Sequence, residues 1–218
     1  MNKYVNYIKV LFVCAAVILI GVVATGAYFT DRETSVNNSF TAAIWSPTPL
    51  PLPSPGAANI LITEVYYNPD ANHGTADDEW IEIYNAGSGS VNLKGWILWD
   101  NNSSETIHEN HILNPGEYAL ISSNASTWNY WSEPSSAEII IVGGLELFNG
   151  LANTGDRVVL FNPTPSEKDA VSWGTDTYAF SPSVAVFTQG HSAERSNHSV
   201  DTNSASDWID QTNPTPGG

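Results

Sequence analysis

The chain has 218 residues, enough for one sizeable domain and a targeting segment, and it contains 8 Trp, 9 Tyr, 7 Phe, 16 Gly and 13 Pro. That composition favours short strands and turns over helices, and it is too rich in aromatic residues for a disordered chain. With 23 acidic and 7 basic residues the net charge is −16, so the surface repels phosphate backbones and we expect no nucleic-acid partner.

The N-terminal segment predicts export. Residues 10–29 carry no charge and follow Lys3 and Lys9, which is the pattern of an apolar N-terminal helix after a positive start. The small residues Thr25 and Ala27 predict a signal peptide over residues 1–27 that is cleaved after Ala27. The alternative is a retained membrane anchor, because 20 uncharged residues can span a bilayer. Either way we expect a secreted protein or one on the extracellular face of the membrane.

Residues 28–56 are expected to form a polar stalk and a Pro-rich linker. Proline occupies nearly every second position over residues 46–56, which favours an extended spacer and places the start of the globular domain near Ala57. The only cysteine, Cys14, lies in the apolar leader, so residues 57–218 have to fold without an internal disulfide.

The residues around the expected cleavage point carry a family resemblance. The runs AYFTD at residues 27–31, ETS at 33–35 and NSFTA at 38–42 resemble the leader of camelysin/TasA-type exported proteins of prokaryotes. The resemblance implies processing by a dedicated ER-type signal peptidase, with cleavage at Ala27. Residues 31–43 are otherwise read as a simple polar stalk.

From residue 57 onward the sequence predicts an all-β domain. Strand signals separated by turns occur at residues 60–67, 80–84, 96–99, 117–122, 138–142, 157–161 and 170–173. No window predicts an amphipathic helix of three turns. About seven short strands with turn signals between them predict an antiparallel β-sandwich.

Residues 78–100 predict a hairpin and part of the core. A polar and apolar strand is followed by a Gly/Ser turn at residues 87–90 and a second aromatic run, which is typical of two paired strands. The expected core residues are Trp80, Ile83, Leu93 and Trp96. Gly95, Gly116 and residues 153–156 are predicted at turns, and Arg157 is expected to pair with a carboxylate such as Glu82.

The ordered blocks of the domain resemble lamin-tail domains of exported prokaryotic proteins. The blocks are ILITEVYYNP, DEWIEIYN, VNLKGW, LNPGEYALI, NTGDRVVLFN, DAVSW, SAERS and SDWIDQTNPTPGG. The resemblance implies an immunoglobulin-like β-sandwich over residues 57–218. Residues 122–137 depart from it as an extra loop, whose Trp128, Tyr130 and Trp131 are candidate ligand contacts.

The sequence offers little support for catalysis. It contains neither GxSxG nor HExxH, and its five histidines lie in polar, loop-like surroundings: His73, His108, His111, His191 and His198. His108 and His111 come nearest to the HExxH motif, but their i,i+3 spacing does not match it, and as a metal pair they would need ligands from elsewhere in the chain. We therefore expect no enzyme activity.

Calcium binding is the better chemical hypothesis, and calcium is the only cofactor that the sequence suggests. One loop concentrates the oxygen donors Asp70, Asn72, Asp77, Asp78 and Glu79, and oxygen is the ligand that calcium takes. The spacing is not that of an EF-hand, and a solvated acidic loop is the alternative reading.

Two classes of function remain open. The first is a surface binding module that holds a protein or glycan through its loops, with membrane contact only through residues 10–29 if the leader is retained. The second is a structural component of the envelope or matrix that self-associates through sheet edges. A calcium-dependent surface module is the third reading.

Overall fold

The computed structural model describes residues 56–132, 136–144 and 146–218. The predicted signal peptide or anchor, its apolar helix and most of the linker lie outside these residues. Within them, no helix is long and apolar enough to cross a membrane.

Six strands form the larger sheet. Their order is β12 (Trp208–Gln211), β11 (Ser192–Arg195), β1 (Ile60–Tyr66), β2 (Trp80–Asn85), β7 (Tyr118–Ser122) and β8 (Glu138–Ile141). The predicted antiparallel β-sandwich is confirmed except at one edge: all neighbours in this sheet are antiparallel but β7 and β8, which run parallel. The parallel pair forms because residues 123–137 separate the two strands, and a connection of this length allows a crossover that a tight turn does not.

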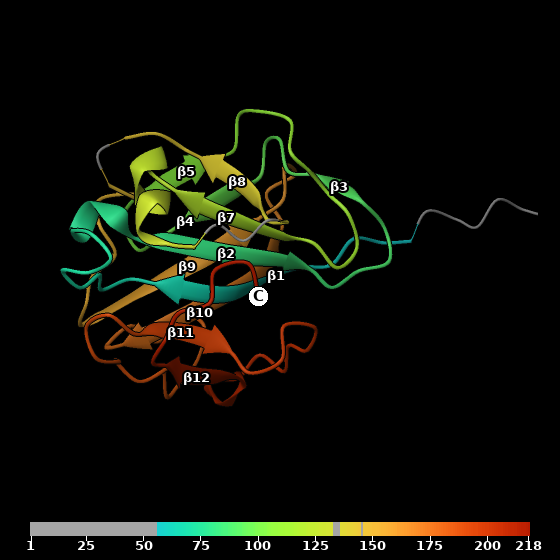
Figure 1. The fold of residues 1–218 in the computed structure, drawn as a ribbon. Helices are drawn as coiled ribbons and strands as arrows, with labels where there is room; N and C mark the ends of the chain where they lie inside the picture. Colours follow the sequence, from blue (N-terminus) through green and yellow to red (C-terminus); the bar gives the residue numbers. More distant parts are fainter. Residues whose placement is uncertain (1–55, 133–135, 145) are drawn as a thin grey trace, which may run out of the picture. The chain divides into compact units, whose positions relative to one another are not determined.

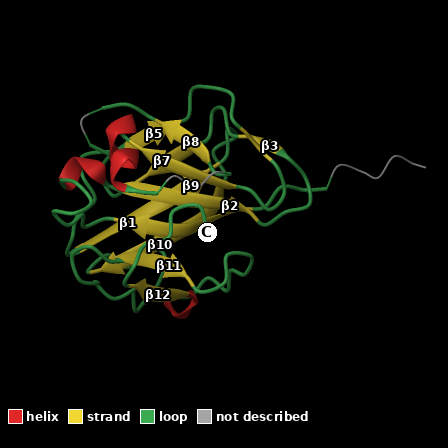
Figure 2. Ribbon diagram, viewed as in Figure 1, coloured by secondary structure: helices red, strands yellow, loops and turns green. Residues whose placement is uncertain are grey.

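Four strands form the second sheet, in the order β10 (Glu167–Gly174), β9 (Gly155–Phe161), β4 (Ile97–Trp99) and β5 (Ser104–Thr106). A short separate pair joins β3 (Val91–Asn92) to β6 (Ile112–Leu113). Figures 1 and 2 show the sheets as the layers of a β-sandwich. One core lies between them, to which the larger sheet contributes Ile62 and Ile83 and the smaller sheet Leu98 and Leu160.

The predicted hairpin in residues 78–100 does not form. β2 pairs with β1 and β7, whereas β4 pairs with β5 and β9 in the other sheet. The turn at residues 87–90 is tied to the start of the domain, since the Ser88 N–H donates to the Ala57 carbonyl at 3.1 Å. The chain therefore crosses between sheets here. Alternation of apolar residues shows which side chains face the core, but not which sheet carries them.

The predicted core residues are all buried, in two different clusters. Ile83, Leu93 and Trp96 belong to the main core between the sheets. Trp80 is buried on the opposite, outer face of the larger sheet. Gly95 and Gly116 both have φ of +80°, which confirms the turns predicted there.

A β-bulge in β1 decides which residues reach the outer face. Ile62 pairs with Ile83 and Glu64 with Glu82, which leaves Thr63 as an extra residue in β1. Beyond the bulge, Val65 returns to the main core while Tyr66 joins the outer cluster.

Arg195 joins the two sheets from a fully buried position. Its Nη2 lies 2.9 Å from Oδ2 of Asp169 in β10, and its Nε donates to the Ile62 carbonyl at 3.0 Å. The same Asp169 oxygen accepts from the Ile62 N–H at 2.7 Å. Burial raises the pKa of Asp169 to about 6, although Arg195 opposes the shift.

Arg157 pairs with a carboxylate, as expected, but the partner is Asp176 and not Glu82. Arg157 binds Asp176 at 2.6 Å and stacks its guanidinium on the rings of Trp99 and Tyr178. Glu82 lies in the other sheet and faces away from the sandwich interior.

Candidate functional site

The outer face of the six-stranded sheet holds the most unusual side chains of the domain. The register places Glu194 of β11 and Glu82 of β2 directly opposite Glu64 of β1, one on each side. We call Glu64, Glu82 and Glu194 the glutamate row. Beyond them the same line continues to Leu120 of β7.

An aromatic cluster fills one half of this face. Tyr66 and Trp80 stack with ring centroids 5.6 Å apart, and Trp128 packs on Trp80 at 6.1 Å. Trp131 presents its edge to Tyr66 and Trp80 at 5.1 and 5.6 Å. Trp128 and its neighbours belong to the short 3-10 helix η3 (Ala125–Tyr130), whose first turn is capped by the Asn124 side chain. The extra loop predicted from the sequence is therefore a lid over this half of the sheet.

The glutamate row fills the other half of this face, where its carboxyl groups accept hydrogen bonds. Glu64 accepts hydrogen bonds from the Ser192 hydroxyl and the Thr215 N–H. Glu82 accepts from the Thr63 hydroxyl at 2.5 Å and the Gly217 N–H at 2.6 Å.

Glu194 completes the row through side chains at its rim. It binds Nε2 of His198 at 3.1 Å and accepts from the Gln211 amide. The other ring nitrogen of His198, Nδ1, lies 2.9 Å from the Tyr118 hydroxyl.

The three carboxyls of the row differ in acidity. Burial raises the pKa of Glu64 to about 8, against the hydrogen bond from Ser192. Burial also raises the pKa of Glu82, against the bonds from Thr63 and Gly217. The hydrogen bond from His198 holds the pKa of Glu194 below its ordinary value.

Residues 212–218, which we call the C-terminal segment, lie over the glutamate row. Thr215 and Gly217 donate their backbone N–H groups to Glu64 and Glu82, as described above. Gly218 lies so close to Tyr118 that a Cβ there would come 2.5 Å from its ring. In Figure 1 the segment crosses over β1 and β2.

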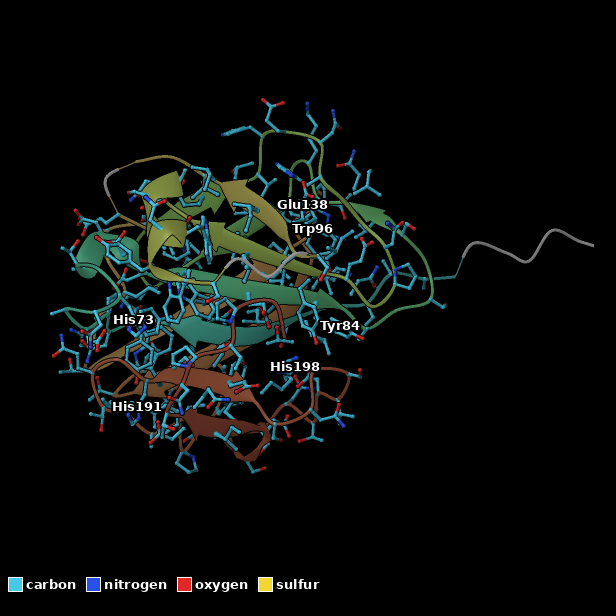
Figure 3. The ribbon with its side chains drawn as sticks, viewed as in Figure 1. His73, Tyr84, Trp96, Glu138, His191 and His198 are labelled. Carbon is cyan, nitrogen blue, oxygen red and sulfur yellow. The ribbon has the colours of Figure 1, made fainter. Side chains whose placement is uncertain are left out.

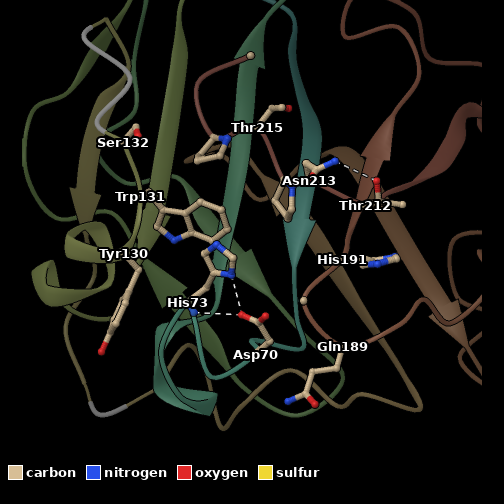
Figure 4. Close-up of a pocket in the computed structure, with 14 residues that line it drawn as sticks. Asp70, His73, Tyr130, Trp131, Ser132, Gln189, His191, Thr212, Asn213 and Thr215 are labelled. Carbon is tan, nitrogen blue, oxygen red and sulfur yellow. Dashed lines mark hydrogen bonds and ion pairs between the residues drawn. The ribbon is translucent and has the colours of Figure 1, made fainter.

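A groove of about 620 Å³ runs between the lid and the C-terminal segment. Figure 4 shows Tyr130, Trp131 and Ser132 along one side, with the C-terminal segment, Gln189 and His191 along the other. His73 and Asp70 lie on its floor and stem from the loop between β1 and β2.

Two histidines of the groove are oriented by carboxylates. Nδ1 of His73 lies 2.6 Å from Asp70, and the His73 ring stacks on Trp131 at 4.4 Å. Nδ1 of His191 lies 2.8 Å from Asp210. Burial acts to raise the pKa of Asp70, but the bonds from His73 and Asn72 outweigh it and lower that pKa. Figure 3 shows His73 and His191 at one end of the sheet and His198 at the other.

The three predicted ligand contacts separate in the structure. Tyr130 is 45% exposed and Trp131 is half-buried, and both line the groove. Trp128 is only 8% exposed and packs on Trp80, so the expectation that it faces a ligand is wrong. The side chain points inward because it closes the aromatic cluster.

The five calcium candidates do not gather into one site. Asp70 binds His73, and Asn72 turns back onto Asp70 at 3.0 Å. Asp78 closes a capping box with Thr75 at the 3-10 helix η2 (Ala76–Asp78).

The remaining two candidates lie apart from Asp70. Asp77 contributes its backbone carbonyl to Ser123 and Asn124. Glu79 is buried and accepts from the Leu151 N–H at 2.9 Å, and burial raises its pKa to about 9. In the described ranges, no three His, Cys, Asp or Glu side chains form a group that could hold a metal ion.

His108 and His111, the possible metal pair of the sequence, have different surroundings. His111 binds Glu138 of β8 at 2.6 Å, and His108 is exposed in the loop before β6. The sequence reasoning missed the glutamate row. The signal was Glu64 inside the apolar run ILITEVYY, since a charge in a strand buried on both faces calls for a partner.

Three comparisons relate the chain to known proteins. A crystal structure of a DUF4876 family protein from Bacteroides thetaiotaomicron is similar at 14% identity and a TM-score of 0.49, covering 72% of each chain. No curated protein matches the chain. The family model of the Lamin Tail Domain, a non-enzymatic domain type, matches residues 53–175, and the chain therefore belongs to the lamin tail domain family.

Proposed function

We propose that this domain is a non-catalytic binding module, secreted or held at the cell surface, whose groove holds a neutral glycan. The groove itself carries the proposal. Its walls combine the rings of Tyr130 and Trp131 with amides and hydroxyls, and among its described lining residues there is neither Lys nor Arg.

The polar side chains of the groove suit sugar hydroxyls. Gln189 and Asn213 each offer a carbonyl and an NH₂ group, and Ser132 and Thr212 each offer a hydroxyl. Such groups both donate and accept, as each hydroxyl of a sugar does. An aromatic ring beside them can pack against the C–H face of a sugar ring. Few other ligands need both contacts at once.

Charge argues for a neutral ligand. Residues 57–218 hold 21 acidic and 4 basic residues, a net charge of −17. A sulfated, phosphorylated or uronic glycan would be repelled by this charge and would meet Asp70 on the floor of the groove.

The same lining speaks against glycan hydrolysis. Glycosidases need a pair of carboxyl groups flanking the scissile bond. The described lining residues offer one carboxylate, Asp70, which is already bound to His73. Binding without turnover is the function that fits.

The test is binding of the full chain to a panel of neutral and anionic polysaccharides by affinity electrophoresis. We expect retardation by a neutral glycan, and a loss of at least about fivefold in affinity on Tyr130→Ala. Tyr178→Ala is the matched control, because Tyr178 is 44% exposed but lies beside the other sheet. Binding to anionic glycans alone, or equal effects of both variants, would overturn the proposal.

Self-association is the second candidate, and edge strand β8 favours it. Ile139 and Ile141 are 38% and 42% exposed, on the face opposite the buried Ile140. An exposed apolar edge can pair with another chain. Sedimentation of the full chain should then show concentration-dependent oligomers that Ile141→Lys abolishes, and a monomer at every concentration contradicts it.

A further inference from the structure

We propose that the glutamate row is a proton-controlled latch, which holds the C-terminal segment on the sheet and thereby keeps the groove closed on that side. The latch itself needs no ligand. Its effect on ligand binding rests on the proposed function, because the segment forms one wall of the proposed glycan groove.

The three carboxyl groups of the row occupy opposite positions in neighbouring strands. Glu64 is directly opposite Glu82 on one side and Glu194 on the other, in neighbouring strands. Like charges in directly opposite positions repel each other. No Lys or Arg of the described residues binds any of the three, and their donors are hydroxyls, amides, backbone N–H groups and His198.

Two carboxyl groups of the row are fully buried, and the hydrogen bonds among the described residues do not satisfy all their oxygens. Glu64 and Glu82 are both 0% exposed. Both donors to Glu64 reach its Oε1, and its Oε2 is buried with no hydrogen-bond partner among the described residues. An ionised carboxylate in this position would leave a charged oxygen unsolvated, so the neutral form is favoured.

Several ionisable side chains face the glutamate row. Besides the row itself, the groups facing it are Tyr84 of β2, Tyr118 of β7 and His198 of the loop after β11. The C-terminal segment contributes no ionisable side chain. Burial raises the pKa of Tyr118 to about 12, so this tyrosine supplies no compensating charge at neutral pH. His198 acts to lower the pKa of Glu82 and Glu194 but is not among the groups that shift the pKa of Glu64.

Deprotonation therefore acts on the segment. When Glu64 loses its proton, near pH 8, a second or third negative charge arises in the row. That charge needs water, and the row is shielded from water by the C-terminal segment, whose Thr215 and Gly217 lie on it. The bonds from these N–H groups stabilise the anion, but burial outweighs them. We infer that the segment lifts as the pH rises.

Lifting removes part of one wall of the groove. Asn213 and Thr215 then no longer face Trp131, and Gln189 and His191 are left on that side of the groove. The groove would then hold its ligand below about pH 8 and release it above.

Amide hydrogen exchange of the full chain tests the latch without any ligand. We expect the protection factors of Thr215 and Gly217, corrected for base-catalysed intrinsic exchange, to fall at least about tenfold between about pH 6 and about pH 9. In Glu64→Gln the protection should stay constant over that range. Glu82→Gln provides the same test if the first variant does not fold.

Glu79→Gln is the matched control. Glu79 is also buried with a raised pKa, but it binds Leu151 and does not contact the segment. This variant should keep the pH dependence of Thr215 and Gly217. Protection that does not change with pH in the wild type, or that falls equally in Glu64→Gln, would overturn the latch.

Binding of a neutral glycan to the same variants separates the two proposals. If the segment responds to pH but no glycan binds, the latch stands and the proposed function fails. If a glycan binds equally at both pH values in the wild type, the latch does not govern the groove.

Discussion

Two segments cover the outer face of the larger sheet, the lid at η3 and the C-terminal segment, and different interactions hold them in place. The lid at η3 buries Trp128 against Trp80 and Tyr66, so apolar contact holds it. The C-terminal segment is held by N–H groups that donate to Glu64 and Glu82. Apolar burial is insensitive to pH, whereas a hydrogen bond to a buried carboxyl depends on its protonation. The aromatic half is therefore a fixed wall of the groove, and the acidic half is an adjustable one.

The aromatic half should show the largest effect of a single substitution. Trp80→Ala removes the centre of the aromatic cluster and should lower the free energy of unfolding by about 3–5 kcal/mol. The loss should be similar at about pH 6 and about pH 9, because the cluster itself contains one ionisable side chain, Tyr66, whose pKa burial raises to about 12. Chemical denaturation measures it.

Trp80→Phe is the control for this prediction. The Trp80 indole N–H is buried with no acceptor among the described residues, so phenylalanine keeps the ring contacts and removes an unpaired donor. It should cost much less than alanine. A loss of under about 1 kcal/mol on Trp80→Ala would show that the lid is not held by burial.

The acidic half should make stability depend on pH. Glu64 keeps its proton to about pH 8 in the folded state, and Glu79 elsewhere keeps its proton to about pH 9, from an ordinary value of 4.5. The folded state thus binds more protons than the unfolded state between these values, and stability falls as the pH rises. We expect a loss of several kcal/mol between about pH 5 and about pH 9, because each of the two groups contributes up to about 1.4 kcal/mol for every pH unit between its unfolded and folded pKa.

Glu64→Gln combined with Glu79→Gln should flatten this dependence. Denaturation curves across the pH range provide the measurement. A stability that rises between about pH 5 and about pH 9 would contradict the assignment of these groups as buried neutral acids.

The hydrogen bonds of the segment should contribute less than the aromatic cluster. Thr215→Pro removes the N–H that donates to Glu64, which should cost about 1–2 kcal/mol. Thr215→Ala keeps that N–H and is the control. Thermal unfolding of the two variants at about pH 6 should therefore differ, and identical melting temperatures would show that this bond does not hold the segment.

The smallest effect on stability is expected at the groove side of the lid. Tyr130→Ala should change the free energy of unfolding by no more than about 0.5 kcal/mol, because the ring is 45% exposed. Trp128→Ala, in the same short helix, should cost about 3 kcal/mol because its ring is buried. If both variants lose stability equally, the division of η3 into a structural and a groove-facing side is wrong.

The sequence predicts much of the fold at the level of single strands. The apolar and β-branched runs at β1, β2, β7, β8, β9 and β10 are correctly located by their local pattern. β11 and β12 were missed, because SAER and WIDQ are short and half polar. β11 pairs with β1 and β12 pairs with β11, and these neighbours supply the stability that their own residues lack.

The groove could be predicted from the sequence less well than the strands. The aromatic residues of the lid are visible in the sequence, but the exposed Tyr130 and the buried Trp128 look alike there. Which ring faces outward depends on the position of Trp80 beneath the lid. The opposite wall comes from residues more than about 50 positions further along the chain, beginning at Gln189.

By itself the sequence determined an acidic, all-β domain without an internal disulfide, because alternation and turn residues act over short distances. Only the tertiary structure decided that β2 and β4 lie in different sheets and that three glutamates lie side by side under the C-terminal segment. Strand register is set by contacts between distant residues, and the bulge at Thr63 fixes which of them face outward.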